Sequence, residues 1–204
     1  MSAPGASLWS SHDISRWSRA RDDYPAVIAR QGVAKLPALD TWYREEFPAL
    51  FSERRLVHIT LDELTRVTEW KMHRGVWRAP NLVRVRSNPA EHVIETTVRA
   101  LSRVPHPTQP IGEIATLDGV GPATASAVVA AMMPTVYPFF DELVAAHVPD
   151  LGPVKWTLGY YARYADLLRA RAAALGADWT PVSVERALWS SVGGKSGATA
   201  VQSD

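Results

Sequence analysis

Apolar residues recur along this chain at the three- and four-residue spacing of α-helices, and proline and glycine interrupt the pattern. The segment Thr60-Leu-Asp-Glu63 is a capping box, because Thr60 accepts from the third helical residue and Glu63 reaches back to the cap. It predicts a helix that runs to about Arg74, with Gly75 as its C-cap. No stretch alternates with the period of two that strands require. The sequence therefore predicts an all-α fold.

Other predicted helices begin at a capping residue or a proline in the first turn. They cover roughly residues 13–30, 36–51, 90–101, 111–116, 123–133, 143–147, 157–175 and 180–192. Pro25 and Pro48 are expected to break the first two, because proline removes a helical donor. Residues 1–12 and 193–204 are rich in small and polar residues, which predicts two disordered tails.

The composition excludes several kinds of chemistry for these residues. The chain has no cysteine, so its residues form no disulfide, offer no thiol nucleophile and hold no iron–sulfur cluster. Its histidines are scattered without metal-ligand spacing, so we expect no metal site and no cofactor. No apolar run approaches the length of a membrane helix and no signal pattern opens the chain, so we expect an intracellular protein without a membrane partner.

The formal charge of +1 gives no global attraction to nucleic acid, so any attraction must be local. The one basic concentration lies between Glu69 and Arg86, where Lys71, Arg74 and Arg78 recur at near-helical spacing. Such a stripe suits a phosphate backbone. The alternative is a solvated helix face whose charges pair within the helix.

Residues 117–141 carry the most specific pattern. Gly119 and Gly121 flank Val120, which predicts a tight turn, and Pro122 then suits the first position of a helix. A turn that leads into a helix N-terminus offers unpaired amides to a phosphate oxygen. A turn between two packed helices also needs glycines when nothing binds, so the glycines alone leave both readings open.

The whole stretch resembles the hairpin and active-site segment of the helix-hairpin-helix DNA glycosylases. In that family a Leu-x-Gly-Val/Ile-Gly hairpin is followed by Thr-Ala and later by an apolar-Pro-apolar run that ends in Asp. The same order is met here by Leu117, Gly119, Val120, Gly121, Thr124, Ala125, Pro138, Phe139, Phe140 and Asp141. The resemblance implies a two-lobed helical fold with a helix-hairpin-helix motif. It also implies that Gly119, Val120, Gly121, Ala123 and Thr124 bind the backbone of double-stranded DNA, with Lys71, Arg74 and Arg78 beside them.

Two positions depart from the family. Ala123 stands where bifunctional members carry the lysine that forms a Schiff base with the sugar, so we expect no lyase chemistry through that position. Asp141 is followed by Glu142-Leu143 instead of the family's small residue and Asn or His. The missing cysteines also exclude the iron–sulfur cluster of part of the family.

The resemblance further implies a domain arrangement. A helical barrel over residues 55–151 would contain the hairpin, and residues 13–54 would join 152–192 in a flanking helical lobe. DNA would lie in the cleft between them. We expect the protein to act as a monomer.

Asp141 is the residue expected to carry catalysis. Excision of a base passes through an oxocarbenium-like sugar, which a carboxylate stabilises while it orients water. The base must first flip out of the duplex. The alternative role of Asp141 is an ordinary helix cap, and the two roles are compatible.

The leading functional hypothesis is therefore a monofunctional DNA glycosylase of base-excision repair that acts on a damaged or mismatched base. A second hypothesis is a DNA-binding or interaction protein of the same fold without catalytic activity. A third is a protein that kept the fold for an unrelated role.

Overall fold

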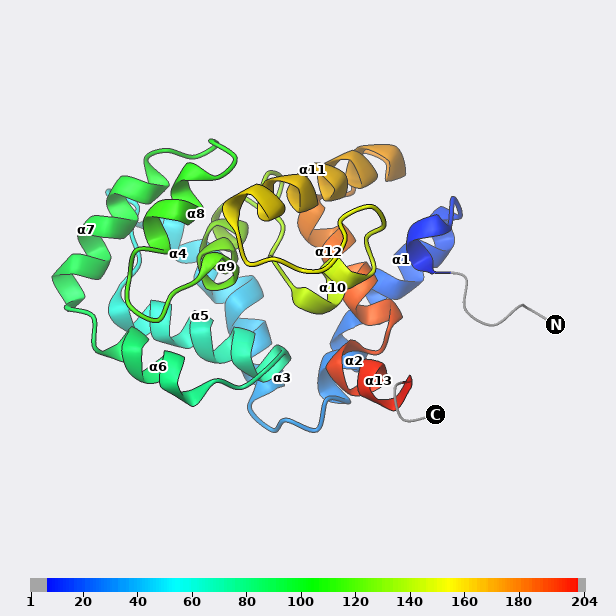
Figure 1. Ribbon diagram of the computed structural model, residues 1–204, viewed down its shortest axis with the longest axis horizontal. Helices are drawn as coiled ribbons and strands as arrows, with labels where there is room; N and C mark the ends of the chain where they lie inside the picture. Colours follow the sequence, from blue (N-terminus) through cyan, green and yellow to red (C-terminus); the bar gives the residue numbers. More distant parts are fainter. Residues whose placement is uncertain (1–6, 202–204) are drawn as a thin grey trace.

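A computed structural model describes residues 7–201, and within this range it contains helices, turns and loops but no strand. The all-α prediction is confirmed. The elements are η1 (Leu8–Ser10), α1 (Ile14–Asp22), α2 (Tyr24–Ala29), α3 (Leu36–Thr41), η2 (Trp42–Glu46), α4 (Phe47–Glu53), α5 (Leu61–Arg74), α6 (Ala79–Arg86), α7 (Ala90–Leu101), α8 (Gln109–Ile114), α9 (Pro122–Met132), α10 (Glu142–Ala146), α11 (Leu158–Leu175), α12 (Pro181–Ser191) and α13 (Gly194–Val201) (Figure 1).

Helix starts follow the local capping signals. At α5 the Thr60 amide donates to Glu63 Oε2 at 2.8 Å and the Glu63 amide donates to Thr60 Oγ1 at 3.3 Å, which confirms the capping box. Thr180 caps α12 in the same reciprocal way with Ser183. These bonds satisfy amides that have no partner within the helix.

The prolines divide the N-terminal helices as predicted. The segment 13–30 separates into α1 and α2, and Pro25 lies in the first turn of α2. The segment 36–51 changes from α3 through the π-helical turn η2 to α4, where Pro48 lies in the first turn. Proline is tolerated at these positions because the amides of a first turn have no helical acceptor.

Helix α6 was not predicted. The segment before Arg86 carries many cations and the proline Pro80, so its sequence indicates a basic concentration and not a helix. In the structure Pro80 lies in the first turn of α6, and Leu82 and Val85 are buried where α6 packs on α5. Tertiary packing thus forms a helix whose local signal is short.

The predicted tails are wrong where the structure describes them. Residues 7–12 contain η1, with Leu8 in the core, and the Trp17 indole donates to the Ser11 carbonyl at 3.0 Å. Residues 194–201 form α13, whose Ser196 amide donates to the Gln31 side chain at 3.0 Å. Residues 1–6 and 202–204 lie outside the described range.

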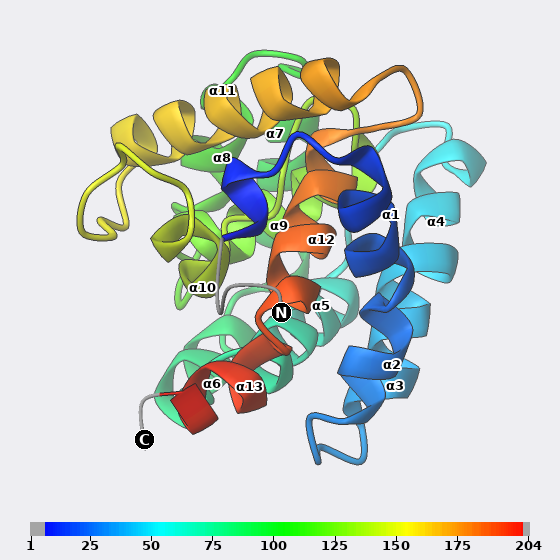
Figure 2. The same ribbon diagram turned by 90° about the vertical axis from the view of Figure 1, so that its right-hand side faces the viewer.

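The N-terminal and C-terminal helices pack together. Helix α1 lies along α12, and α12 also contacts α2 and α11 (Figure 2). Helix α5 contacts α3, α6 and α9, while α7, α8 and α9 pack in succession. Buried residues from all of these regions form one hydrophobic cluster. The division into a barrel and a flanking lobe stays a prediction.

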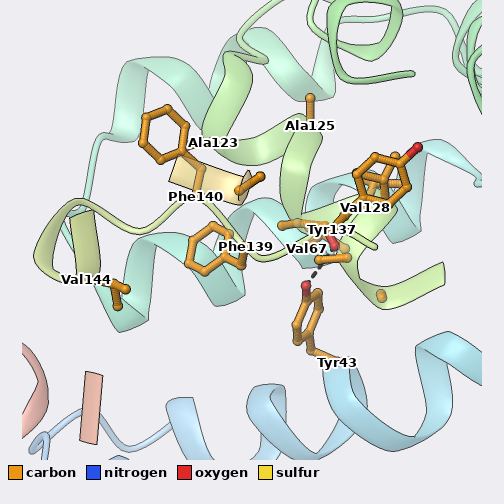
Figure 3. Packing of buried hydrophobic residues seen from close by; sticks show 14 of the residues in the cluster. Tyr43, Val67, Ala123, Ala125, Val128, Tyr137, Phe139, Phe140 and Val144 are labelled. Atoms are coloured by element: carbon orange, nitrogen blue, oxygen red, sulfur yellow. Dashed lines mark hydrogen bonds between the residues drawn. The ribbon is translucent and has the colours of Figure 1, made fainter. Parts of the chain in front are cut away.

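Helix α9 lies at the centre of this core. Every residue from Ala123 to Ala131 is buried, and most are alanine or valine, so neighbouring backbones approach closely. The Tyr43 hydroxyl donates to the Ala127 carbonyl at 2.7 Å and ties η2 to the same helix (Figure 3). Among the described helices, none is long and apolar enough to span a bilayer.

Candidate active site

The turn between α8 and α9 packs tightly against α6. Gly119 has φ +74°, and a Cβ built on it would lie 2.5 Å from the Asn81 carbonyl oxygen and 2.8 Å from the Val85 amide nitrogen. Glycine is therefore required by the backbone angle and by the close approach of α6. Gly121 has φ −104°, and no atom lies within 4 Å of an added Cβ there.

The two glycines should respond differently to substitution. We expect Gly119→Ala to reduce the free energy of unfolding by about 2–4 kcal/mol, through the positive φ and the overlap with α6. Gly121→Ala is the matched control, and we expect it to cost about 1 kcal/mol or less, because it changes only an N-cap residue with free space around it. Urea unfolding of both variants measures the difference. Equal stability of the two would contradict this account of the turn.

Asn88, which follows α6, holds the turn in place. Its side-chain oxygen accepts from the Asp118 amide at 3.0 Å, and its nitrogen donates to the Asp118 and Val85 carbonyls at 3.0 and 2.8 Å. Asn88 is 5 % exposed. These bonds satisfy backbone groups of the turn that have no partner within a helix.

Most of the predicted hairpin contacts have buried side chains. Val120, Ala123 and Thr124 lie in the core, and only Gly119 and Gly121 are partly exposed. Gly121 is the N-cap residue of α9 and makes no side-chain cap. A phosphate would therefore meet backbone amides near Gly121, and this contact stays a prediction.

The segment before Asp141 is extended and crosses α9. Phe139 and Phe140 lie on opposite sides of it (Figure 3). Phe139 packs 5.1 Å from the Trp70 ring, and Phe140 packs 4.9 Å from the Trp156 ring. The Phe140 amide donates to Ser126 Oγ at 2.9 Å, which fixes the segment on α9. This packing sets the position of the residue that follows.

Asp141 caps α10 and is 7 % exposed. Its Oδ1 accepts from the amides of Leu143 and Val144 at 2.8 and 3.2 Å. Its Oδ2 lies 3.9 Å from Arg74 Nη1, beyond hydrogen-bond distance. The predicted cap is confirmed, and it uses one oxygen of the carboxylate.

The assignment of Arg74 to a surface stripe is wrong. Its side chain is buried, and its Nη2 donates to Glu185 Oε1 in the closest ion pair of this region. The guanidinium carbon lies 4.6 Å from the Trp189 ring centroid and 5.2 Å from that of Phe139. Aromatic faces and a carboxylate thus enclose this cation, so it cannot reach a phosphate on the protein surface.

Glu185 is the site residue that sequence reasoning missed. Burial raises the pKa of Glu185, and the charge of Arg74 opposes that rise. Burial would lower the pKa of Arg74, but Glu185, Tyr24 and Asp141 together raise it. Arg74 therefore stays a cation between two carboxylates, one from α12 and one from the start of α10. A glutamate in the middle of α12 carries no local signal for this role.

A pocket of about 410 Å³ opens beside Asp141. Its wall combines aromatic rings, two acids and several cations from α5, the following loop and α10. The residues that line it are Lys71, Arg74, Gly75, Val76, Arg78, Phe139, Phe140, Asp141, Glu142, Leu143, Ala146, Trp156, Trp189 and Lys195. A cavity of this size and mixed character suits a small organic group.

Lys71 and Arg78 differ from Arg74 in their exposure. Lys71 is partly buried in the pocket wall and Arg78 is exposed. Burial and the nearby charge of Arg78 lower the pKa of Lys71, and Asp141 and Glu142 oppose this change. The predicted stripe thus becomes three cations of one pocket wall, of which Arg74 is buried.

The structure brings Asp141, Lys71, Arg74 and Arg78 together in one pocket. The five hairpin residues do not line it. Within residues 7–201, no group of three His, Asp or Glu side chains is arranged to hold a metal ion. No protein-family model, curated protein or solved structure matches this chain. The function is therefore argued from the geometry of this pocket.

Proposed function

We propose that this protein binds double-stranded DNA and hydrolyses the N-glycosidic bond of a flipped base in the Asp141 pocket. The observation that carries the proposal is a nearly buried carboxylate in the wall of an aromatic and basic pocket of about 410 Å³. The local resemblance of residues 117–141 to the helix-hairpin-helix glycosylases supports the same reading.

Each part of the pocket has a chemical task in this proposal. The exposed Trp156 ring offers an apolar face to a base, since stacking on aromatic rings is tolerant of base identity. Asp141 Oδ2 supplies the negative charge for a sugar that becomes cationic as its bond to the base breaks. Lys71 and Arg78 meet the phosphates that flank the flipped nucleotide.

Arg74 Nη1 lies 3.9 Å from Asp141 Oδ2, and its positive charge would oppose a sugar cation beside that carboxylate. The charge of Glu185 offsets much of this cation, so the pocket is not closed to a positive transition state.

The assay is incubation with duplexes that each carry one lesion or mismatch, followed by alkaline cleavage of abasic sites. We expect strand cleavage at one or more lesions after alkali and none without it, because Ala123 replaces the lyase lysine. Binding without excision across the whole panel would leave the second hypothesis, a non-catalytic DNA-binding protein. The use of Asp141 Oδ1 as a helix cap favours that second hypothesis.

The two pocket cations, Lys71 and Arg78, provide a separate test of DNA binding. We expect Lys71→Ala/Arg78→Ala to weaken binding to any duplex and to reduce the slope of log K against log salt by about 1–2. Arg171→Ala is the control, because its guanidinium lies 4.7 Å over the Trp9 ring on another part of the molecule. Titrations at several salt concentrations measure the slope. A folded double variant with unchanged affinity for duplex would contradict the proposal that this pocket binds DNA.

A further inference from the structure

A second pocket, of about 310 Å³, lies between η2, the end of α9 and the start of α12. It shares only Phe139 with the Asp141 pocket. One part of its wall is apolar and includes Ala130, Ala131 and Pro134, and the other part carries Arg44 and Arg186. Nothing in the proposed DNA chemistry uses these residues.

The two arginines of this pocket differ in their partners. Arg44 Nε donates to both oxygens of Asp40, at 3.3 and 3.1 Å, so its charge is matched. Arg186 makes no ion pair with a carboxylate among residues 7–201. Its Nε is buried and has no hydrogen-bond partner there. Arg186 is thus a partly buried cation that forms no ion pair within this part of the chain.

The surroundings of Arg186 increase the need for an anion. Its guanidinium carbon lies 5.0 Å from the Tyr24 ring centroid, and that of Arg44 lies 4.3 Å from the same centroid. Burial and the charge of Arg44 lower the pKa of Arg186, and Tyr24, Asp40 and Glu185 only partly oppose this change. A protein normally pairs a cation that it removes from water, because an unpaired one is destabilising.

The chemistry of the wall selects the kind of anion. Guanidinium groups present parallel donors that match the two oxygens of a carboxylate. Glu185 also lines the pocket, and its Oε2 is buried without a donor, which disfavours a doubly charged group such as a phosphate monoester. The alanines and the proline favour an apolar body. We propose that this pocket binds a small monocarboxylate with an apolar body, held by Arg186 with Arg44 beside it.

The proposal is tested by titrating the full chain with benzoate, hexanoate and acetate, using calorimetry. Benzamide is the neutral control, because it keeps the shape of benzoate without its charge. We expect benzoate or hexanoate to bind, and benzamide to bind at least about tenfold more weakly, as expected for loss of a charge-assisted contact. No binding of any carboxylate at about 10 mM, or equal binding of benzoate and benzamide, would overturn the proposal.

A pair of variants locates the contact. We expect Arg186→Met to weaken carboxylate binding at least about tenfold. We also expect it to raise the melting temperature of the free protein, because it removes an unpaired cation. Arg171→Met is the matched control, since it too removes a partly buried guanidinium over an aromatic ring, and it should leave carboxylate binding unchanged. Unchanged carboxylate binding in the Arg186 variant would assign the contact elsewhere.

The same titration in the presence of duplex DNA shows whether the natural anion is a carboxylate or a DNA phosphate. Because the pocket is separate from Asp141, benzoate should bind equally in the presence of saturating duplex, and Arg186→Met should bind duplex as the parent protein does. Loss of duplex affinity in Arg186→Met would make the natural anion a DNA phosphate and would overturn the carboxylate assignment. The outcome is independent of whether the protein excises a base.

Discussion

Asp141→Asn should abolish base excision while leaving DNA binding intact. Asparagine keeps the size and the oxygen that accepts from the Leu143 and Val144 amides, so α10 should remain capped. It removes the charge that would stabilise the sugar cation and the base that would accept the proton of water. We expect the excision rate to fall by about 10³-fold or more, with equal or tighter binding to duplex.

Single-turnover excision and duplex titration measure the two effects separately. The urea midpoint of Asp141→Asn serves as the control, because it should stay close to that of the parent protein if the cap survives. Excision at the parent rate would show that Asp141 acts only as a cap. Glu142 would then be the next residue to test, since it lines the same pocket. Glu69 forms an ion pair with Arg86 instead, so it is a weaker candidate.

The largest loss of stability is expected when the buried ion pair behind the pocket is broken. Arg74→Met leaves Glu185 as a buried carboxylate without a cation at its Oε1. Removal of one member of such a pair typically reduces the free energy of unfolding by about 3–5 kcal/mol, because the remaining charge is not compensated. Urea unfolding at neutral pH measures the change.

A double variant distinguishes charge from packing. Arg74→Met/Glu185→Leu replaces the pair by apolar side chains, which are often tolerated where an ion pair is buried. We expect it to recover most of the stability lost in Arg74→Met. A double variant as unstable as the sum of the two single variants would mean that the pair contributes through shape alone. The aromatic rings around Arg74 would then be the main contact.

The helix starts were predictable because their signals are local. Thr60, Thr157 and Thr180 each cap a helix through an amide only three residues away. The missed helix α6 has a short apolar pattern, and only its packing on α5 explains why it forms. The two-lobed arrangement that the resemblance implies stays a prediction.

The candidate site was predictable only in part, because its main electrostatic contact is not local. Asp141 was identified from the residues around it, and Lys71 and Arg78 lie in its pocket. The spacing of Lys71, Arg74 and Arg78 predicts a surface stripe, but spacing does not show that Arg74 has a buried partner. Its partner Glu185 lies 111 residues away in the chain, and no spacing rule connects the two.

The Asn88 clamp has a mechanical consequence. It joins the end of α6 to a turn 30 residues further along the chain through bonds to both the amide and the carbonyl of Asp118. Gly119 also packs directly against α6 at this junction, so the turn has no space to move closer to α6. These contacts restrict movement of the turn relative to the end of α6. A duplex that contacts both the turn and the end of α6 would have to adapt its own helical path, because these bonds hold the two parts of the protein at one distance.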